Sequence, residues 1–144
     1  MRLPILVALA LLALGACASV APVAPGGQTE ACIAPAAPRA VAQMYFGRNI
    51  GGTLGVGEAD WAAFVDREIT PHFPDGLTVA DVDGQWRDSD NGSIVREPSK
   101  QLTVFLADET RDRAALDAIA EAYKTQFQQQ AVALVVETSC VSFE

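Results

Sequence analysis

Four stretches of this 144-residue chain carry the hydrophobic patterns of β-strands. In residues 41–48 (VAQMYFGR), Ala42, Met44 and Phe46 fall on one face, which predicts a strand with one buried side. Residues 77–87 and 94–106 also read as strands, and the turn formers DSDNGS between them predict a hairpin. Pro98 predicts a bulge or a late entry into the second of these strands. Residues 131–136 are continuously apolar, which suits a strand buried on both faces.

Two other stretches follow the period of an α-helix. Residues 58–70 begin with acidic residues and are closed by Pro71, and their apolar positions Trp61, Phe64, Val65 and Ile69 share one face. Residues 111–127 carry the clearest apolar stripe, formed by Leu116, Ile119, Ala120, Tyr123 and Phe127.

The resulting order βαββαβ matches a ferredoxin-like α+β domain, in which a four-stranded antiparallel sheet has both helices on one face. The length fits one such domain, which we expect over residues 40–144. In this topology the last strand lies antiparallel beside the first. The second face of the sheet is left without a covering layer.

The N-terminal segment predicts export. Residues 1–16 combine the basic Arg2 with an apolar run and small residues, as a secretory signal does. Its end, LGAC, resembles the lipobox of bacterial lipoproteins, which implies lipidation of Cys17. An ordinary signal cut near Ala18, or an uncleaved span over residues 3–24, are the alternatives.

Cysteine number agrees with that interpretation. The chain has three cysteines, and lipidation of Cys17 leaves Cys32 and Cys140 as an even pair in an oxidising compartment. The sequence of strands brings the segment before the first strand close to the end of the last one. We therefore expect a Cys32–Cys140 disulfide, with two free thiols as the alternative.

Composition narrows the range of partners. Residues 17–39 are rich in Ala, Pro and Gly and predict a tether between the lipid and the domain. The net charge of −8 leaves no basic patch for nucleic acid, and anionic headgroups would be repelled. The expected membrane contact is thus the lipid on Cys17. The resemblance to bacterial lipoproteins implies that Ala18 after that cysteine directs sorting to the periplasmic side of the outer membrane.

Several segments resemble a known bacterial family. They are YFGR at 45–48, EADWAAFVDREITPHFPDGLTV at 58–79, GQWRD at 84–88 and REPSK at 96–100. With these segments the chain is similar to the family called domain of unknown function 3574, over about residues 41–143. The resemblance implies a small exported protein, often a lipoprotein, and no established activity.

Three motifs suggest chemistry, but each is better explained by structure. His72 stands alone, with no nucleophile that can be paired with it, so we expect no catalytic residue. The glycine-rich loop at 49–57 lacks the spacing of phosphate-binding loops, and we expect no cofactor. Four aspartates in DVDGQWRDSDNG at 81–92 fail the calcium-loop spacing and suit turns, so we expect no metal.

The remaining candidates form a binding face that includes the uncovered side of the sheet. They are Tyr45, Trp86, Arg87, Glu97, Lys100 and Phe105. We expect a non-catalytic module of the cell envelope that binds a small ligand or an envelope protein there, and the fold also allows a homodimer through this face. A small enzyme of the dimeric α+β barrel type, with a cavity between two sheets, is the alternative. Solvated charge pairs across the hairpin are the purely structural explanation.

Overall fold

The computed structural model describes residues 31–144, so the expected signal segment, Cys17 and the first part of the expected tether lie outside the described residues. The elements are β1 Ala37–Gly47, β2 Asn49–Ile50, β3 Thr53–Leu54, α1 Glu58–Phe64, the π-helix η1 Val65–Ile69, β4 Thr78–Arg87, β5 Ile94–Phe105, α2 Glu109–Phe127 and β6 Ala133–Val141. Strand β1 therefore begins within the segment expected to be a tether.

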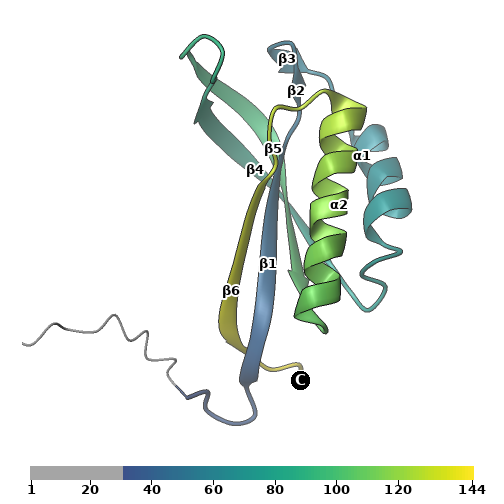
Figure 1. Cartoon of the computed structure of the whole chain (residues 1–144), viewed down its shortest axis with the longest axis vertical. Helices are drawn as coiled ribbons and strands as arrows, with labels where there is room; N and C mark the ends of the chain where they lie inside the picture. The colour runs from purple at the N-terminus through teal and green to yellow at the C-terminus, as the bar shows by residue number, and fades with distance from the viewer. Residues whose placement is uncertain (1–30) are drawn as a thin grey trace, which may run out of the picture. The chain divides into compact units, whose positions relative to one another are not determined.

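The four long strands form one antiparallel sheet in the order β4-β5-β1-β6. Both helices cover the same face, and no helix of residues 31–144 covers the other face (Figure 1). This arrangement confirms the ferredoxin-like α+β fold. We call the uncovered side the open face.

Burial agrees with the predicted alternation. Met44 and Phe46 of β1 and Leu102 of β5 are fully buried against the helices. Tyr123 of α2 packs on Phe46 at a ring distance of 4.8 Å, and its hydroxyl donates a hydrogen bond of 2.8 Å to the carbonyl of Gly47. The aromatic cluster of the core consists of Phe46, Trp61, Phe64, Tyr123 and Phe127.

The first helix differs in detail from its prediction. It was expected as one α-helix over residues 58–70, but its last turns widen into a π-helix from Val65 to Ile69. The wider turn still buries Ile69 fully. The second helix starts two residues earlier than predicted because the side chain of Asp108 caps the backbone N–H of Arg111.

Two strand predictions need correction. Strand β6 is not buried on both faces: it runs from Ala133 to Val141 at the edge of the sheet, with alternating burial. Strand β5 passes through Pro98 with unbroken register to β4, without the expected bulge. The carbonyl of Pro98 accepts from the N–H of Arg48, so its proline nitrogen faces β1 just where β1 has ended and needs no donor.

The expected crosslink is present, since Cys32 and Cys140 form a disulfide with a Cα–Cα distance of 5.4 Å. Cys140 lies opposite Pro38 in the β1–β6 register. Antiparallel pairing of the first and last long strands thus brings the two cysteines together, as the topology predicted.

Candidate functional site

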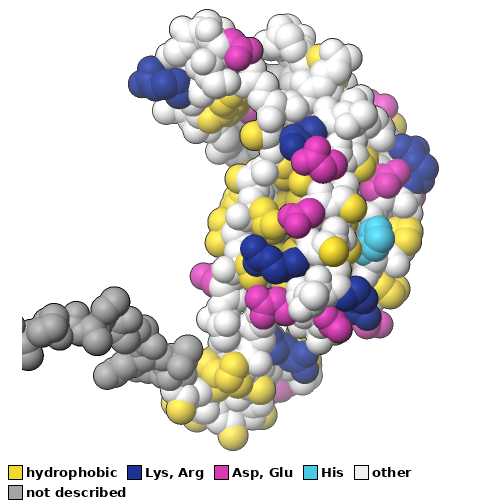
Figure 2. Space-filling model, viewed as in Figure 1, with side chains coloured by type: hydrophobic (Ala, Val, Ile, Leu, Met, Phe, Trp, Pro, Cys, Tyr) yellow, Lys and Arg dark blue, Asp and Glu magenta, His cyan; other side chains and the backbone are white. Residues whose placement is uncertain are grey.

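Four of the six candidate residues lie on the open face. Tyr45 of β1 shares this face with Gln101 and Glu97 of β5, and Trp86 of β4 pairs with Val95 two positions from Glu97. Phe105 lies on the same face at the far end of β5. Figure 2 shows that this side of the domain is hollowed below the β4–β5 hairpin and carries hydrophobic side chains along the hollow.

A cavity of about 340 Å³ lies on the open face where β4 and β5 bend toward the hairpin. The loop between α2 and β6 closes one side of it. Gln129 of this loop donates to the carbonyl of Asn49 at 2.7 Å, and Gln130 contacts Asp90 of the hairpin turn at 3.2 Å. The lining residues are Tyr45, Gly47, Gly84, Gln85, Trp86, Glu97, Ser99, Gln129, Gln130, Ala131 and Ala133. We call it the Glu97 cavity.

The carboxylate of Glu97 is held firmly in this cavity. The residue is only 8% exposed. Its Oε1 accepts from the indole Nε1–H of Trp86 at 2.7 Å, and its Oε2 accepts from the backbone N–H of Asn49 at 3.0 Å. Both donors are neutral. Because two fixed donors already orient the carboxylate, ligand binding would not require the side-chain entropy loss of ordering it.

Two strand glycines make room for side chains of β5: Gly47 for the carboxylate of Glu97, and Gly84 for the hydroxyl of Ser99. A Cβ on Gly47 would lie 2.5 Å from the Oε1 of Glu97, well inside van der Waals contact. A Cβ on Gly84 would lie 2.8 Å from the Oγ of Ser99. Glycine weakens a strand interior and often marks a close approach, and here it allows a side chain to lie across the sheet surface.

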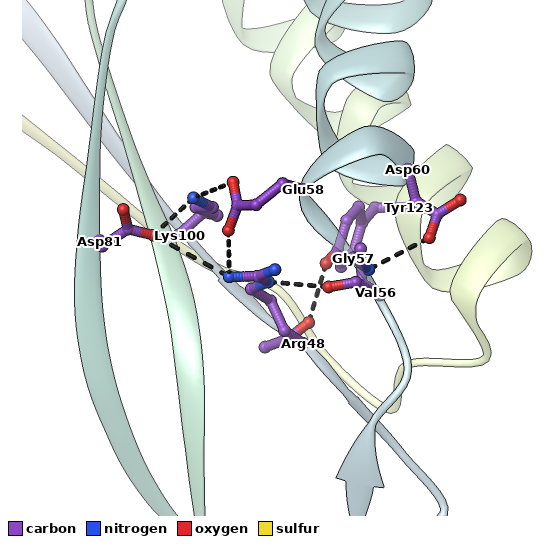
Figure 3. A network of polar contacts seen from close by, with 9 residues as sticks. Arg48, Val56, Gly57, Glu58, Asp60, Asp81, Lys100 and Tyr123 are labelled. Atoms are coloured by element: carbon purple, nitrogen blue, oxygen red, sulfur yellow. Dashed lines mark hydrogen bonds and ion pairs between the residues drawn. The ribbon is translucent and has the colours of Figure 1, made fainter.

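Lys100 departs from the expected binding face. It lies opposite Asp81 on the helix-covered side and is 4% exposed. Its Nζ donates to Glu58 at 2.8 Å and pairs with Asp81, while the buried Arg48 pairs with Glu58 at 2.7 Å (Figure 3). This network joins the start of α1 to β4, β5 and the end of β1.

The contacts in this network favour the charged forms of Lys100 and Glu58. The hydrogen bonds that Lys100 donates to Asp81 and Glu58 raise the pKa of Lys100, and the bond it donates to Glu58 holds the pKa of Glu58 below its usual range. A lysine kept protonated is a poor nucleophile. The network therefore has a structural role.

Arg87 and Phe105 lie away from the Glu97 cavity. The guanidinium of Arg87 donates to the carbonyl of Gly92 at 2.8 Å and so closes the hairpin. The ring of Phe105 packs edge-on against Phe143 at 5.2 Å, beside a separate hollow at the other end of the sheet. The structure thus brings together Tyr45, Trp86 and Glu97, and leaves the other three candidates elsewhere.

The other motifs lie in structural settings. His72 lines a wide, shallow hollow with Asp112, whose carboxylate already accepts from the backbone of Ala107 and Asp108 at 2.9 Å. The glycine-rich loop folds into the β2–β3 hairpin, with positive φ at Gly51 and Gly52. Within residues 31–144, no group of three or more metal-binding side chains is present.

Sequence reasoning missed the glycines and glutamines of the cavity. Gly84, inside the otherwise regular strand β4, and Gly47, at the end of β1, were the available signal. Gln129 and Gln130 gave no signal, because their positions depend on how the α2–β6 loop meets the hairpin.

The fold and the cavity define a ferredoxin-like α+β protein with a polar and aromatic cavity on its open face. The chain belongs to the family described as Protein of unknown function (DUF3574), whose profile matches residues 41–143. No curated protein matches this chain. Among residues 31–144, no helix is long and apolar enough to cross a membrane.

Solved structures of a phage enzyme show the same fold at low identity. A phage SAM lyase in complex with S-methyl-5'-thioadenosine is 14% identical with a TM-score of 0.59, over 73% of this chain and 90% of that one. The apo phage SAM lyase is 15% identical with a TM-score of 0.55, over 74% and 93%. CutA from Synechococcus elongatus is 14% identical with a TM-score of 0.46, over 72% and 78%. The likeness to the phage enzyme concerns the fold alone.

Proposed function

We propose that this protein is a non-catalytic binding module and that its ligand occupies the Glu97 cavity. The observation that carries the proposal is this cavity of about 340 Å³, within the size range of small-molecule sites, with a buried carboxylate already oriented inside it. Aromatic and amide side chains form its walls. Such a mixture of apolar surface and a few fixed polar groups is typical of ligand sites.

The polar groups near the cavity favour binding over catalysis. Both oxygens of Glu97 are engaged by hydrogen bonds in the ligand-free protein. Burial raises the pKa of Tyr123, which keeps that phenol neutral and unsuited to proton transfer at ordinary pH. Lys100, also kept protonated, lies on the other face of the sheet.

Ligand retention tests this proposal. Native mass spectrometry of the full chain, extracted with detergent from its own membrane, is expected to show a retained small molecule. Ala133→Trp fills the cavity and should remove that molecule. Ala80→Trp places the same ring on the open face outside the cavity, so this variant should still retain the molecule. Absence of a retained molecule, or retention in Ala133→Trp, would contradict the proposal.

We also propose that the module is exported and anchored by lipid on Cys17, on the periplasmic side of the outer membrane. The signal-like segment 1–16 and the small residues before Cys17 support this. Metabolic labelling with an alkyne fatty acid should mark the wild type and Cys32→Ser but not Cys17→Ser. Equal labelling of Cys17→Ser, or a fully water-soluble wild type, would contradict the anchor.

An enzyme of the dimeric α+β barrel type is the second candidate. Phe105 and Val135 support it, because both are at least 40% exposed on the open face, where a second sheet could cover them. In that case the full chain sediments as a dimer, Val135→Asp dissociates it, and the retained molecule is consumed on incubation. A wild-type monomer would exclude this candidate.

A further inference from the structure

Among the described residues that line the Glu97 cavity, Glu97 is the one that carries a charge. The other lining groups are glutamine amides, hydroxyls, two aromatic rings and small residues. An anion in this cavity would lie close to the carboxylate of Glu97, which would repel it. The chain as a whole carries a net charge of −8, which favours cations in the same way over longer distances.

The carboxylate lacks a cationic partner within the described part of the chain. The ion pairs there include none to Glu97. Three cations from the neighbouring strands are engaged elsewhere: Arg48 and Lys100 pair with Glu58, and Arg87 bonds a backbone carbonyl. A buried charge is normally paired, because water no longer solvates it fully. Each oxygen of Glu97 accepts one hydrogen bond and retains further acceptor capacity.

The aromatic walls suit a particular kind of cation. Trp86 directs the N–H edge of its indole at the carboxylate, and Tyr45 lines the cavity while its hydroxyl bonds Gln43 at 2.8 Å. Aromatic faces attract organic cations, and the indole does so most strongly. A divalent metal ion is a poorer fit, because such ions take several oxygen ligands and the cavity supplies one carboxylate.

From this arrangement we infer that the ligand of the Glu97 cavity is a small organic cation, bound through an ammonium group that pairs with Glu97 beside the rings of Trp86 and Tyr45. This inference rests on the proposed binding function and names its ligand class. A primary ammonium donates hydrogen bonds to the carboxylate, whereas a quaternary one relies more on the rings.

Titration with isosteric pairs isolates the charge. One pair is choline and the uncharged dimethylbutanol in which carbon replaces the nitrogen; the other is butylamine and butanol. The full-length protein in detergent is observed through the indole N–H resonance of Trp86, which bonds Glu97, with Trp61 as an internal reference. We expect at least one cation to shift the Trp86 resonance at concentrations about tenfold lower than its neutral partner.

Variants assign the effect to the carboxylate. Glu97→Gln keeps the shape and should lower the affinity for the cation about tenfold, measured by calorimetry. The matched control is Glu137→Gln, which removes the same charge from an exposed site on the same face. Should Glu97→Gln fail to fold, Trp86→Leu keeps the carboxylate and should weaken choline more than butylamine.

The outcomes separate this inference from the proposed function. Equal binding of charged and neutral probes, or an equal loss of affinity in both glutamine variants, would overturn the cation inference and leave the cavity as a binding site. Absence of binding by all four probes, together with an empty cavity in native mass spectrometry, would overturn both.

Discussion

Removal of the Cys32–Cys140 disulfide should lower stability by a large and calculable amount. The two cysteines are separated by 108 residues, so the crosslink closes a loop that spans almost the whole described domain. The chain-entropy relation for a loop of this length gives about 4.8 kcal/mol at 25 °C. This amount is comparable to the entire stability of many domains, about 5–15 kcal/mol.

The expected change in melting temperature follows from the size of the domain. An unfolding entropy of about 2.1 cal/mol/K per residue gives roughly 0.24 kcal/mol/K for the described residues. The Cys32→Ser, Cys140→Ser double variant should therefore melt about 20 °C lower. Because the crosslink acts on the unfolded chain, its loss should also raise the denaturant m-value, as the unfolded ensemble expands.

Urea unfolding of three samples measures this effect: oxidised wild type, wild type in reductant, and the double variant. The reduced wild type and the variant should agree, because both lack the bridge and share the native register of β1 and β6. Cys17→Ser serves as the control for the third cysteine. A difference between the oxidised and reduced proteins below about 1 kcal/mol would refute the loop-entropy reasoning.

Three further changes test other contacts. Tyr123→Phe removes the hydrogen bond to Gly47 and should lower the free energy of unfolding by about 1 kcal/mol, measured by urea unfolding. Gly47→Ala should displace the carboxylate of Glu97, destabilise the domain by about 1–3 kcal/mol and shift the indole N–H resonance; an unchanged resonance contradicts the close packing. Burial raises the pKa of Asp112, but its hydrogen bonds outweigh this and leave the pKa lowered. Its stabilisation is therefore present above the unfolded-state pKa of about 3.9 and lost as pH falls through the lower folded value, so Asp112→Asn should flatten the acid decline in melting temperature.

Much of the fold could be predicted from local patterns. Alternation in residues 41–48 correctly assigned Met44 and Phe46 to the core, and the order of elements led to the sheet topology and the disulfide. The same alternation places Lys100 with Leu102 on the helix side. Grouping Lys100 with the open-face residues overlooked this parity.

The cavity itself was beyond reach of the sequence. Its walls depend on the bend of the β4–β5 hairpin and on the contact of Gln130 with Ser89 and Asp90 in the hairpin turn. Gln130 and Asp90 are 40 residues apart in the sequence. Neither periodicity nor turn propensity encodes such a contact. The role of Gly47 is likewise visible only once Glu97 lies across it.

Strand β1 runs between two ends of the domain that differ in what they carry. The chain enters the sheet at Ala37, beside the crosslinked cysteine, and reaches the cavity at Gly47. At about 3.3 Å per residue, these points are roughly 30 Å apart. The proposed lipid on Cys17 would therefore join the chain before the Ala37 end of β1, whereas the Glu97 cavity lies at the other end of that strand, so a ligand could bind without contacting the crosslinked end of the domain.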